Sequence, residues 1–214
     1  MSGFQEFWYF FKKNKGAVAG LFFILLFCLI ALFARWIAPF GEAEIVSDQL
    51  QLSPFWNQPA GSVKYYLGTD DLGRDLLSRL IFGAQVSMGI GFSVVIISMI
   101  IGTVLGLIAG YVGGYFDKLL MRLIDILMAL PSILLAIVVV SVLGPSLINA
   151  IVAVSLVAIP NFVRLVRASV MAEKEKQYVI AAKSFGASHF RVLVINIFPN
   201  CLAPLIVQIG RAHV

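Results

Sequence analysis

The residues with the clearest functional pattern lie in a polar stretch, Glu173–Pro199, that separates two long apolar runs; we call it the island. Two alanines and two aromatic residues in it recur at helical spacing: Tyr178, Ala181, Ala182 and Phe185. Such a face predicts non-covalent binding to another protein, because the alanines let a partner's groove approach the helix backbone closely. Gly186 can end this helix in the left-handed conformation, and Ser188 can cap a second one. The island is therefore predicted to be a helix, a turn and a helix.

No pattern typical of catalysis accompanies the island. The sequence has no GxxxxGK[ST] phosphate loop, no HExxH zinc pattern, no serine nucleophile elbow and no paired cysteine ligands. The chain is therefore predicted not to be an enzyme and to hold no cofactor and no metal. A partner-binding segment in such a chain is what we expect where a separate protein supplies the energy.

An acidic cluster near Leu67–Ser87 could suggest a calcium site, but it lacks the spacing and terminal glutamate of an EF-hand. Capping is the simpler interpretation, with Thr69 or Asp70 beginning a short amphipathic helix on the outer membrane surface. Arg74 and Asp75 are then expected to form local ion pairs.

The elements that must position these residues are membrane helices. Of the 214 residues, 60% are hydrophobic and 13% are charged, and the apolar runs reach the length of about 20 residues that a span needs. The alternation of a membrane strand is absent. We therefore predict an all-α, polytopic membrane protein with five visible spans: Ala17–Ala38, Val86–Gly110, Leu120–Leu143, Leu147–Val163 and Val192 to the end.

The net charge of +5 is explained by basic residues beside the spans and does not indicate nucleic acid. Lysines precede the first span, and further Lys and Arg surround the island, so both are predicted to be cytoplasmic. Cys28 and Cys201 lie in or near apolar runs and are predicted to be small core residues and not a disulfide.

Glycines recur every four residues in the second span, at Gly102, Gly106 and Gly110. This ridge favours close packing of a neighbouring helix, with a hinge as the alternative. Pro131 should bend the third span, which is compatible either with a cavity lining or with a purely structural kink. In the same span Asp125 is expected to pair with Arg122, three residues earlier on the same face.

The island resembles the EAA loop of ABC-importer permeases, through Ala181, Ala182, Gly186 and Pro199. Ile180 stands where that family has its leading glutamate. The segments LGTDDLGRDLLSRLIFGAQVS, GLIAGYVGGYFD, MRLIDILMALPSILLA and NIFPNCLAPLIVQ extend the resemblance to the C-type permeases of dipeptide and oligopeptide importers, most of all the dipeptide importers. It covers Phe7 to Gln208.

The resemblance implies a type I ABC-importer permease fold with six spans in the full-length protein. It implies a multi-pass subunit of the bacterial inner membrane that imports dipeptides or short oligopeptides. The implied partners are a homologous B-type permease, two cytoplasmic ATPase subunits that bind ATP, an external peptide-binding protein and membrane lipid. The expected coupling element comprises Tyr178, Ala181, Ala182, Phe185 and Gly186, while Pro131 and the glycine ridge shape the path.

Three alternatives remain at this point: an ABC permease for nickel, haem or another small solute, a secondary transporter or channel, and a membrane scaffold that transports nothing. The expected organisation is an N-terminal anchor span with an outer loop over residues 1–83, then an incomplete permease domain over 84–214. Its coupling loop is placed at about 168–191. Because five spans are visible and Arg211 and His213 would lie in the bilayer, the chain is expected to be C-terminally truncated, with a foreign tail at Ile209–Val214.

Overall fold

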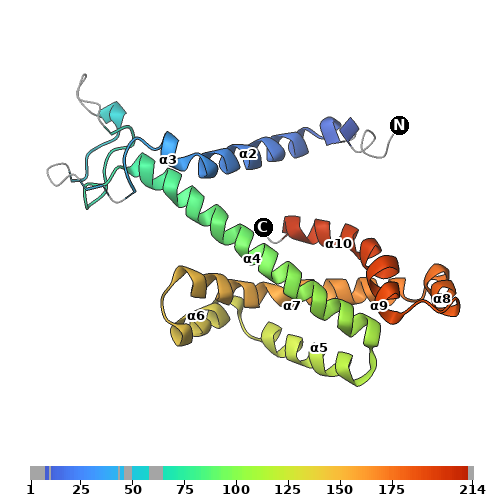
Figure 1. Cartoon of the computed structure of the whole chain (residues 1–214). Coiled ribbons are helices and arrows are strands. Elements are labelled where there is room, and N and C mark those ends of the chain that lie inside the picture. The colour runs from blue at the N-terminus through green and yellow to red at the C-terminus, as the bar shows by residue number, and fades with distance from the viewer. Residues whose placement is uncertain (1–7, 10, 43, 46–49, 58–64, 212–214) are drawn as a thin grey trace. The chain divides into compact units, whose positions relative to one another are not determined.

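The computed structural model describes residues 8–9, 11–42, 44–45, 50–57 and 65–211, and every helix in this part of the chain is drawn in Figure 1. The chain divides into two compact units, Met1–Ile90 and Gly91–Val214, and the boundary falls within helix α4. The principal helices are α2 (Lys15–Leu32), α3 (Ala34–Ile37), α4 (Leu76–Val112), α5 (Gly114–Ala129), α6 (Ser132–Leu143), α7 (Leu147–Glu173), α8 (Gln177–Ser184), α9 (His189–Arg191) and α10 (Phe198–Arg211). A short 3₁₀ turn covers Phe55–Asn57, and a π-helical segment, η2, covers Val192–Ile197.

Three of the described helices are long and apolar enough to cross a membrane, namely α2, α4 and α7. The third predicted span is instead a broken pair, α5 and α6, bent by 96° where Leu130 and Pro131 leave the helix. The fifth predicted span begins in η2, and the apolar helix there, His189–Leu202, is shorter than a span. The helical membrane architecture is therefore confirmed, and the described residues contain three spans, or four if the bent pair is one.

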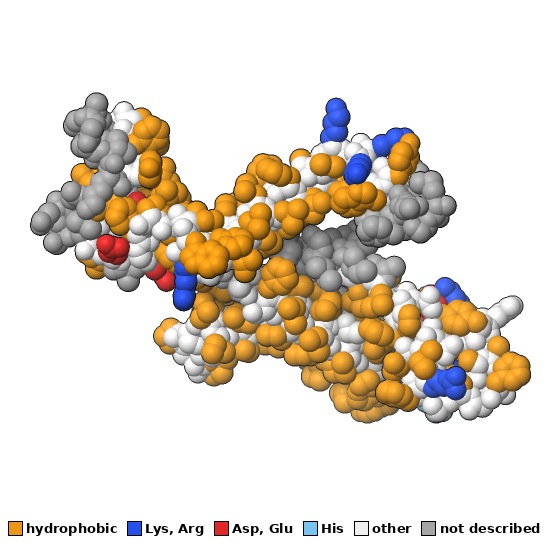
Figure 2. Space-filling view, turned by 45° about the horizontal axis from the view of Figure 1, so that its top comes forward, with side chains coloured by type: hydrophobic (Ala, Val, Ile, Leu, Met, Phe, Trp, Pro, Cys, Tyr) orange, Lys and Arg blue, Asp and Glu red, His pale blue; other side chains and the backbone are white. Residues whose placement is uncertain are grey.

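Exposed apolar side chains cover these helices, as expected where lipid or other membrane helices surround them. In α2 only Ala31 is buried, and Phe22, Phe23 and Leu25 are each more than half exposed. Figure 2 shows hydrophobic side chains over much of the visible surface, with Lys and Arg confined to small areas. A helix that is apolar on all sides is typical of a membrane span.

In the first unit, the α3–α4 loop is described at residues 38–42, 44–45, 50–57 and 65–75. The prediction of a separate amphipathic helix capped by Thr69 or Asp70 is wrong, since no helix forms over residues 70–75 and α4 itself begins at Leu76. The cap is Asp75, whose carboxylate accepts hydrogen bonds of 2.7 Å from both the backbone N–H and the hydroxyl of Ser78. Residues 58–64 of this loop lie outside the described part of the chain.

The second unit is built on α7, against which α5, α6 and α10 all pack. Its core cluster joins α7 to the island and to α10, and comprises Phe162, Val166, Val170, Val179, Val192, Ile197, Cys201 and Leu205. Cys201 is a buried free cysteine, as predicted, and Cys28 is also free but half-buried.

The glycine ridge of α4 lies against α7. A Cβ added at Gly102 would come within 2.4 Å of the Cβ of Phe162, and one at Gly106 within 2.8 Å of the Val163 carbonyl oxygen. Gly110 is equally confined, by Val170 and the carbonyl of Arg167. Real Cβ atoms do not approach other atoms so closely, and glycine is therefore the residue that permits this helix contact.

Two ion pairs tie α5 to α7. Asp125 does not pair with Arg122 as predicted; it accepts a 2.5 Å hydrogen bond from Arg164 of α7. Asp117 accepts two hydrogen bonds, of 2.5 and 2.7 Å, from the guanidinium of Arg167. The two carboxylates of α5 are therefore paired across the helix contact and not along the helix.

Candidate functional site

The island folds as predicted, into α8, a tight turn and α9. Gly186 adopts φ +81°, and the left-handed residue ends α8. The Gly186 N–H donates to the Lys183 carbonyl at 3.0 Å, and the Ala187 N–H donates to the Ala182 carbonyl at 3.1 Å. These two bonds form a Schellman motif. Ser188 then caps α9, because its hydroxyl oxygen accepts from the Arg191 N–H at 3.3 Å.

One side of α8 is buried within the second unit. Val179 is fully buried in the core cluster, and Ala182 packs against that cluster. The four residues of the predicted binding face are thus divided by the fold: Ala182 faces the interior, while Ala181 and Phe185 are exposed. Tyr178 is 40% exposed, and its hydroxyl donates a hydrogen bond to the Glu173 carboxylate at the start of the island.

The other side of the island presents large apolar side chains to solvent. Phe185 is 91% exposed, Phe190 is 76% exposed and Ile180 is 53% exposed. Burying a side chain of this size is favourable by about 1.5–3 kcal/mol, so their exposure favours a protein partner. Phe190 and Ile180 were not among the predicted site residues. The signal for Phe190 was its place just after the Ser188 cap, outside the α8 face on which the prediction was based.

A second set of contacts joins the island to the end of α4. The Tyr111 hydroxyl and His189 Nδ1 lie 2.8 Å apart, and their rings meet edge to face at 5.8 Å. Lys183 lies over the Tyr111 ring, 5.2 Å from its centroid, and Lys174 donates to the Gly110 carbonyl at 3.0 Å. The pairing of Tyr111 with His189 could not be foreseen from local sequence patterns, because 78 residues separate the two.

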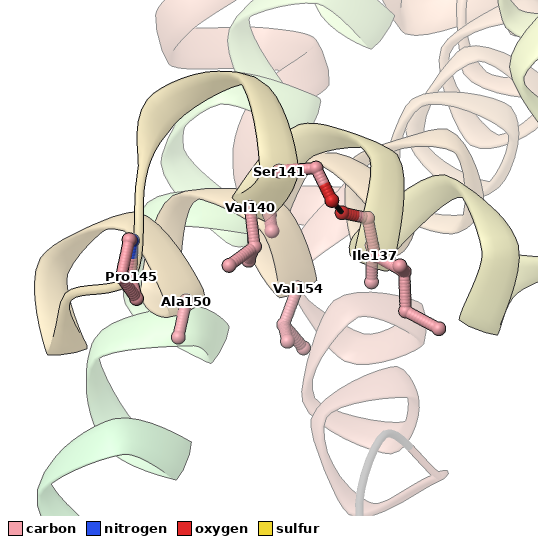
Figure 3. Close-up of a pocket in the computed structure, with 8 residues that line it drawn as sticks. Ile137, Val140, Ser141, Pro145, Ala150 and Val154 are labelled. Atoms are coloured by element: carbon pink, nitrogen blue, oxygen red, sulfur yellow. Dashed lines mark hydrogen bonds between the residues drawn. The ribbon is translucent and has the colours of Figure 1, made fainter.

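The remaining predicted site residue, Pro131, directly precedes α6. An apolar cavity of 440 Å³ lies between α6 and α7, and Pro131 is not among the residues that line it. Figure 3 shows Ile137, Val140, Ser141, Pro145, Ala150 and Val154 around it. The Ser141 hydroxyl donates to the Ile137 carbonyl within its own helix at 2.8 Å. The cavity therefore offers apolar contact and little directed hydrogen bonding. Among the described residues no cluster of His, Cys, Asp and Glu could hold a metal ion.

Comparison with known proteins identifies two family models. The one described as binding-protein-dependent transport system inner membrane component matches residues 102–213, and the N-terminal TM domain of oligopeptide transport permease C matches residues 2–59.

The chain is also similar along most of its length to individual transport permeases. The chain is 53% identical to the dipeptide transport system permease protein DppC of Escherichia coli, over 97% of this chain and 69% of that protein. It is 50% identical to the di/tripeptide transport system permease protein DppC of Pseudomonas aeruginosa, over 97% of this chain and 68% of that protein. The glutathione transport system permease protein GsiD of Shigella flexneri is 42% identical, over 95% and 65% of the two chains.

Proposed function

This chain belongs to the family of binding-protein-dependent transport system inner membrane components and is a permease subunit of an ATP-driven peptide importer; we propose that its island couples it to ATPase subunits. Its substrates are dipeptides or short oligopeptides, and it is not itself an enzyme. The other subunits of such a system supply ATP hydrolysis and substrate capture.

One observation supports the coupling role: one side of the island is packed in the core, and the other side exposes large apolar side chains. Val179 and Ala182 are held in the core, while Phe185, Phe190 and Ile180 stand in solvent within one short segment. An ATPase subunit with an apolar groove would bury these side chains and push on a segment that continues directly into α10. Tyr178, Ala181, Ala182, Phe185 and Gly186 remain the proposed coupling element, with Ala182 and Gly186 setting its shape.

The finer arrangement follows from the family and from charge. We propose a complex with a homologous B-type permease, two cytoplasmic ATPases and an external peptide-binding protein, in a lipid bilayer. The lysines before α2 and the basic residues of the island support a cytoplasmic position for both segments. ATP binding then closes the ATPases around the island and opens the path outward, and hydrolysis resets it. Pro131 and the glycine ridge shape that path.

The test is co-purification of the permease with the products of its neighbouring genes, followed by an ATPase assay. We expect a stable complex whose ATP hydrolysis is stimulated by a peptide-loaded binding protein. A permease that retains no ATPase under mild extraction, yet still moves peptide, would instead be a secondary transporter. If a nickel- or haem-loaded binding protein stimulated ATP hydrolysis and a peptide-loaded one did not, the assignment of peptides as substrates would be overturned.

A further inference from the structure

The hydroxyl of Tyr178 is the point at which three elements of the second unit meet. It donates to the Glu173 carboxylate at the end of α7, and it accepts from Asn200 Nδ2 of α10 at 3.0 Å. It also lies 3.3 Å from the carbonyl oxygen of Asn196, in η2. A side chain that only docked a partner would have no need of three internal partners.

The Asn196 carbonyl lies in η2, whose π-helical winding directly precedes Phe198 and Pro199. Pro199 has no N–H, and in an α-helix its ring would clash with the carbonyl four residues earlier; a wider π turn relieves such a clash. The Asn196 carbonyl accepts a 2.9 Å hydrogen bond from the Asn200 side chain in addition to the contact with Tyr178. Two side chains, those of Tyr178 and Asn200, therefore contact one carbonyl of this irregular turn.

The Tyr178 hydroxyl has one proton and two acceptors for it. Desolvation, together with the nearby Glu173 carboxylate, raises the pKa of Tyr178 to about 12, so the proton stays on the hydroxyl at neutral pH. Of the two acceptors, the Glu173 carboxylate lies closer to the hydroxyl, and Lys176 forms a 2.6 Å ion pair with that carboxylate. Since one proton can serve one acceptor well, a shift of α8 would exchange the bond to α7 for a bond to η2.

We propose that Tyr178 is a positioning residue of the coupling element, whose hydroxyl joins α8 to α7 and to the π-helical start of α10. This role rests on the proposed function and goes beyond it, because it moves Tyr178 from the surface that meets the ATPase to the linkage inside the permease. An ATPase that pushes on Phe185 then moves η2 through the Tyr178 hydroxyl. The ring supports α8, and the hydroxyl carries the displacement.

The test uses the assembled importer in proteoliposomes, with Tyr178→Phe as the variant and Tyr115→Phe as the control. Tyr115 is 82% exposed in α5, so its substitution changes the same atoms without touching the linkage. We expect Tyr178→Phe to remain in complex with its ATPase subunits, while the uptake of labelled dipeptides per ATP hydrolysed falls about five- to tenfold. Amide hydrogen exchange over Val192–Phe198 should accelerate by a similar factor.

A second variant separates linkage from simple destabilisation. Asn200→Ala removes a donor to the same hydroxyl and to the same carbonyl, so it should lower the uptake per ATP in the same way. The double variant should lose less than the sum of the two single losses, because both variants remove the bond between Asn200 and the Tyr178 hydroxyl. Additive losses, or normal uptake per ATP in Tyr178→Phe, would overturn the inference. Neither result would affect the proposed function, which fails only if the wild-type complex lacks ATP-driven uptake.

Discussion

The α3–α4 loop and the island are both irregular connections between long helices, but their polar groups are used in opposite ways. In the loop, Asp70 accepts four hydrogen bonds from its own neighbourhood: from the backbone N–H groups of Leu72 and Arg74, from Arg74 Nε and from Arg79 Nη1. In the island, His189 and Lys174 make contacts with the end of α4 across 78 and 64 residues of sequence. The loop determines its own shape, whereas the shape of the island depends on the helices around it.

This difference corresponds to what each region can do. A connection closed by local bonds keeps its shape when the surrounding helices move. A connection held by bonds to several helices moves with them, and it can transmit a push. In the proposed complex, the exposed side chains of Phe185 and Phe190 form the surface that the ATPase contacts.

The sharpest test of the contrast is Phe185→Asp. A carboxylate at the most exposed aromatic position of the island should weaken ATPase binding by about 2 kcal/mol or more, which is over tenfold in retention during co-purification. The matched control is Leu72→Asp in the α3–α4 loop, where the leucine is 52% exposed. Equal loss of ATPase from both variants would remove the distinction between the two regions.

Two glycines with nearly identical backbone angles provide the next test. Gly68 has φ +82° and Gly186 has φ +81°, but a Cβ at Gly68 would come within 2.1 Å of the Leu52 carbonyl oxygen, whereas one at Gly186 has open space. We expect Gly68→Ala to lower the free energy of unfolding by more than about 3 kcal/mol, and Gly186→Ala by about 1 kcal/mol. Thermal unfolding of the purified protein in detergent measures both. A similar midpoint for the two variants would show that the loop yields as readily as the island.

Acid should loosen the loop through Asp70. Its backbone hydrogen bond from Arg74 is the largest of the contributions that lower the pKa of Asp70, from 3.8 to about 2. Because the folded pKa lies below the ordinary value, the stabilisation is complete above about pH 4 and is lost as the pH falls toward 2. Cleavage by pepsin between Leu67 and Arg79 should therefore rise over that range.

The Asp70 effect has a matched control in its neighbour. Asp70→Asn should be cleaved readily at pH 4 and show little further change toward pH 2, whereas the exposed Asp71→Asn should behave like the wild type. A wild-type profile in Asp70→Asn would mean that other groups hold the loop closed.

The smallest effect is expected at the link between α4 and the island. His189→Phe keeps the ring contact with Tyr111 but loses the hydrogen bond, which is worth about 1 kcal/mol or less at an exposed position. The melting midpoint should fall by a few degrees, and ATP hydrolysis should change less than about twofold. Tyr111→Phe removes the same bond from the other side and should match it. Unequal effects would show that one of the two side chains has another role.

Local sequence patterns predicted the helix–turn–helix structure of the island, whereas contacts between residues distant in sequence were not predicted. Gly186 and Ser188 were identified because a left-handed glycine and a capping serine act within a few residues. Asp125 was assigned to Arg122 by helical spacing, but it pairs with Arg164, and no pattern within one helix reveals the facing helix. The same limit applies to the π-helical segment η2. Pro199 can be read from the sequence, but the hydrogen bond between the Tyr178 hydroxyl and the Asn196 carbonyl cannot.

Helix α4 also has a consequence for the bilayer. Its 37 residues extend about 55 Å, whereas the hydrocarbon layer is about 30 Å thick. Such a helix tilts or projects from the membrane, and its tilt follows membrane thickness. Since its glycine ridge is fixed on α7, a thicker bilayer would change the angle of α7 as well. Acyl-chain length is thus expected to tune the rate of peptide uptake, with the lipid acting as an effector of the transporter.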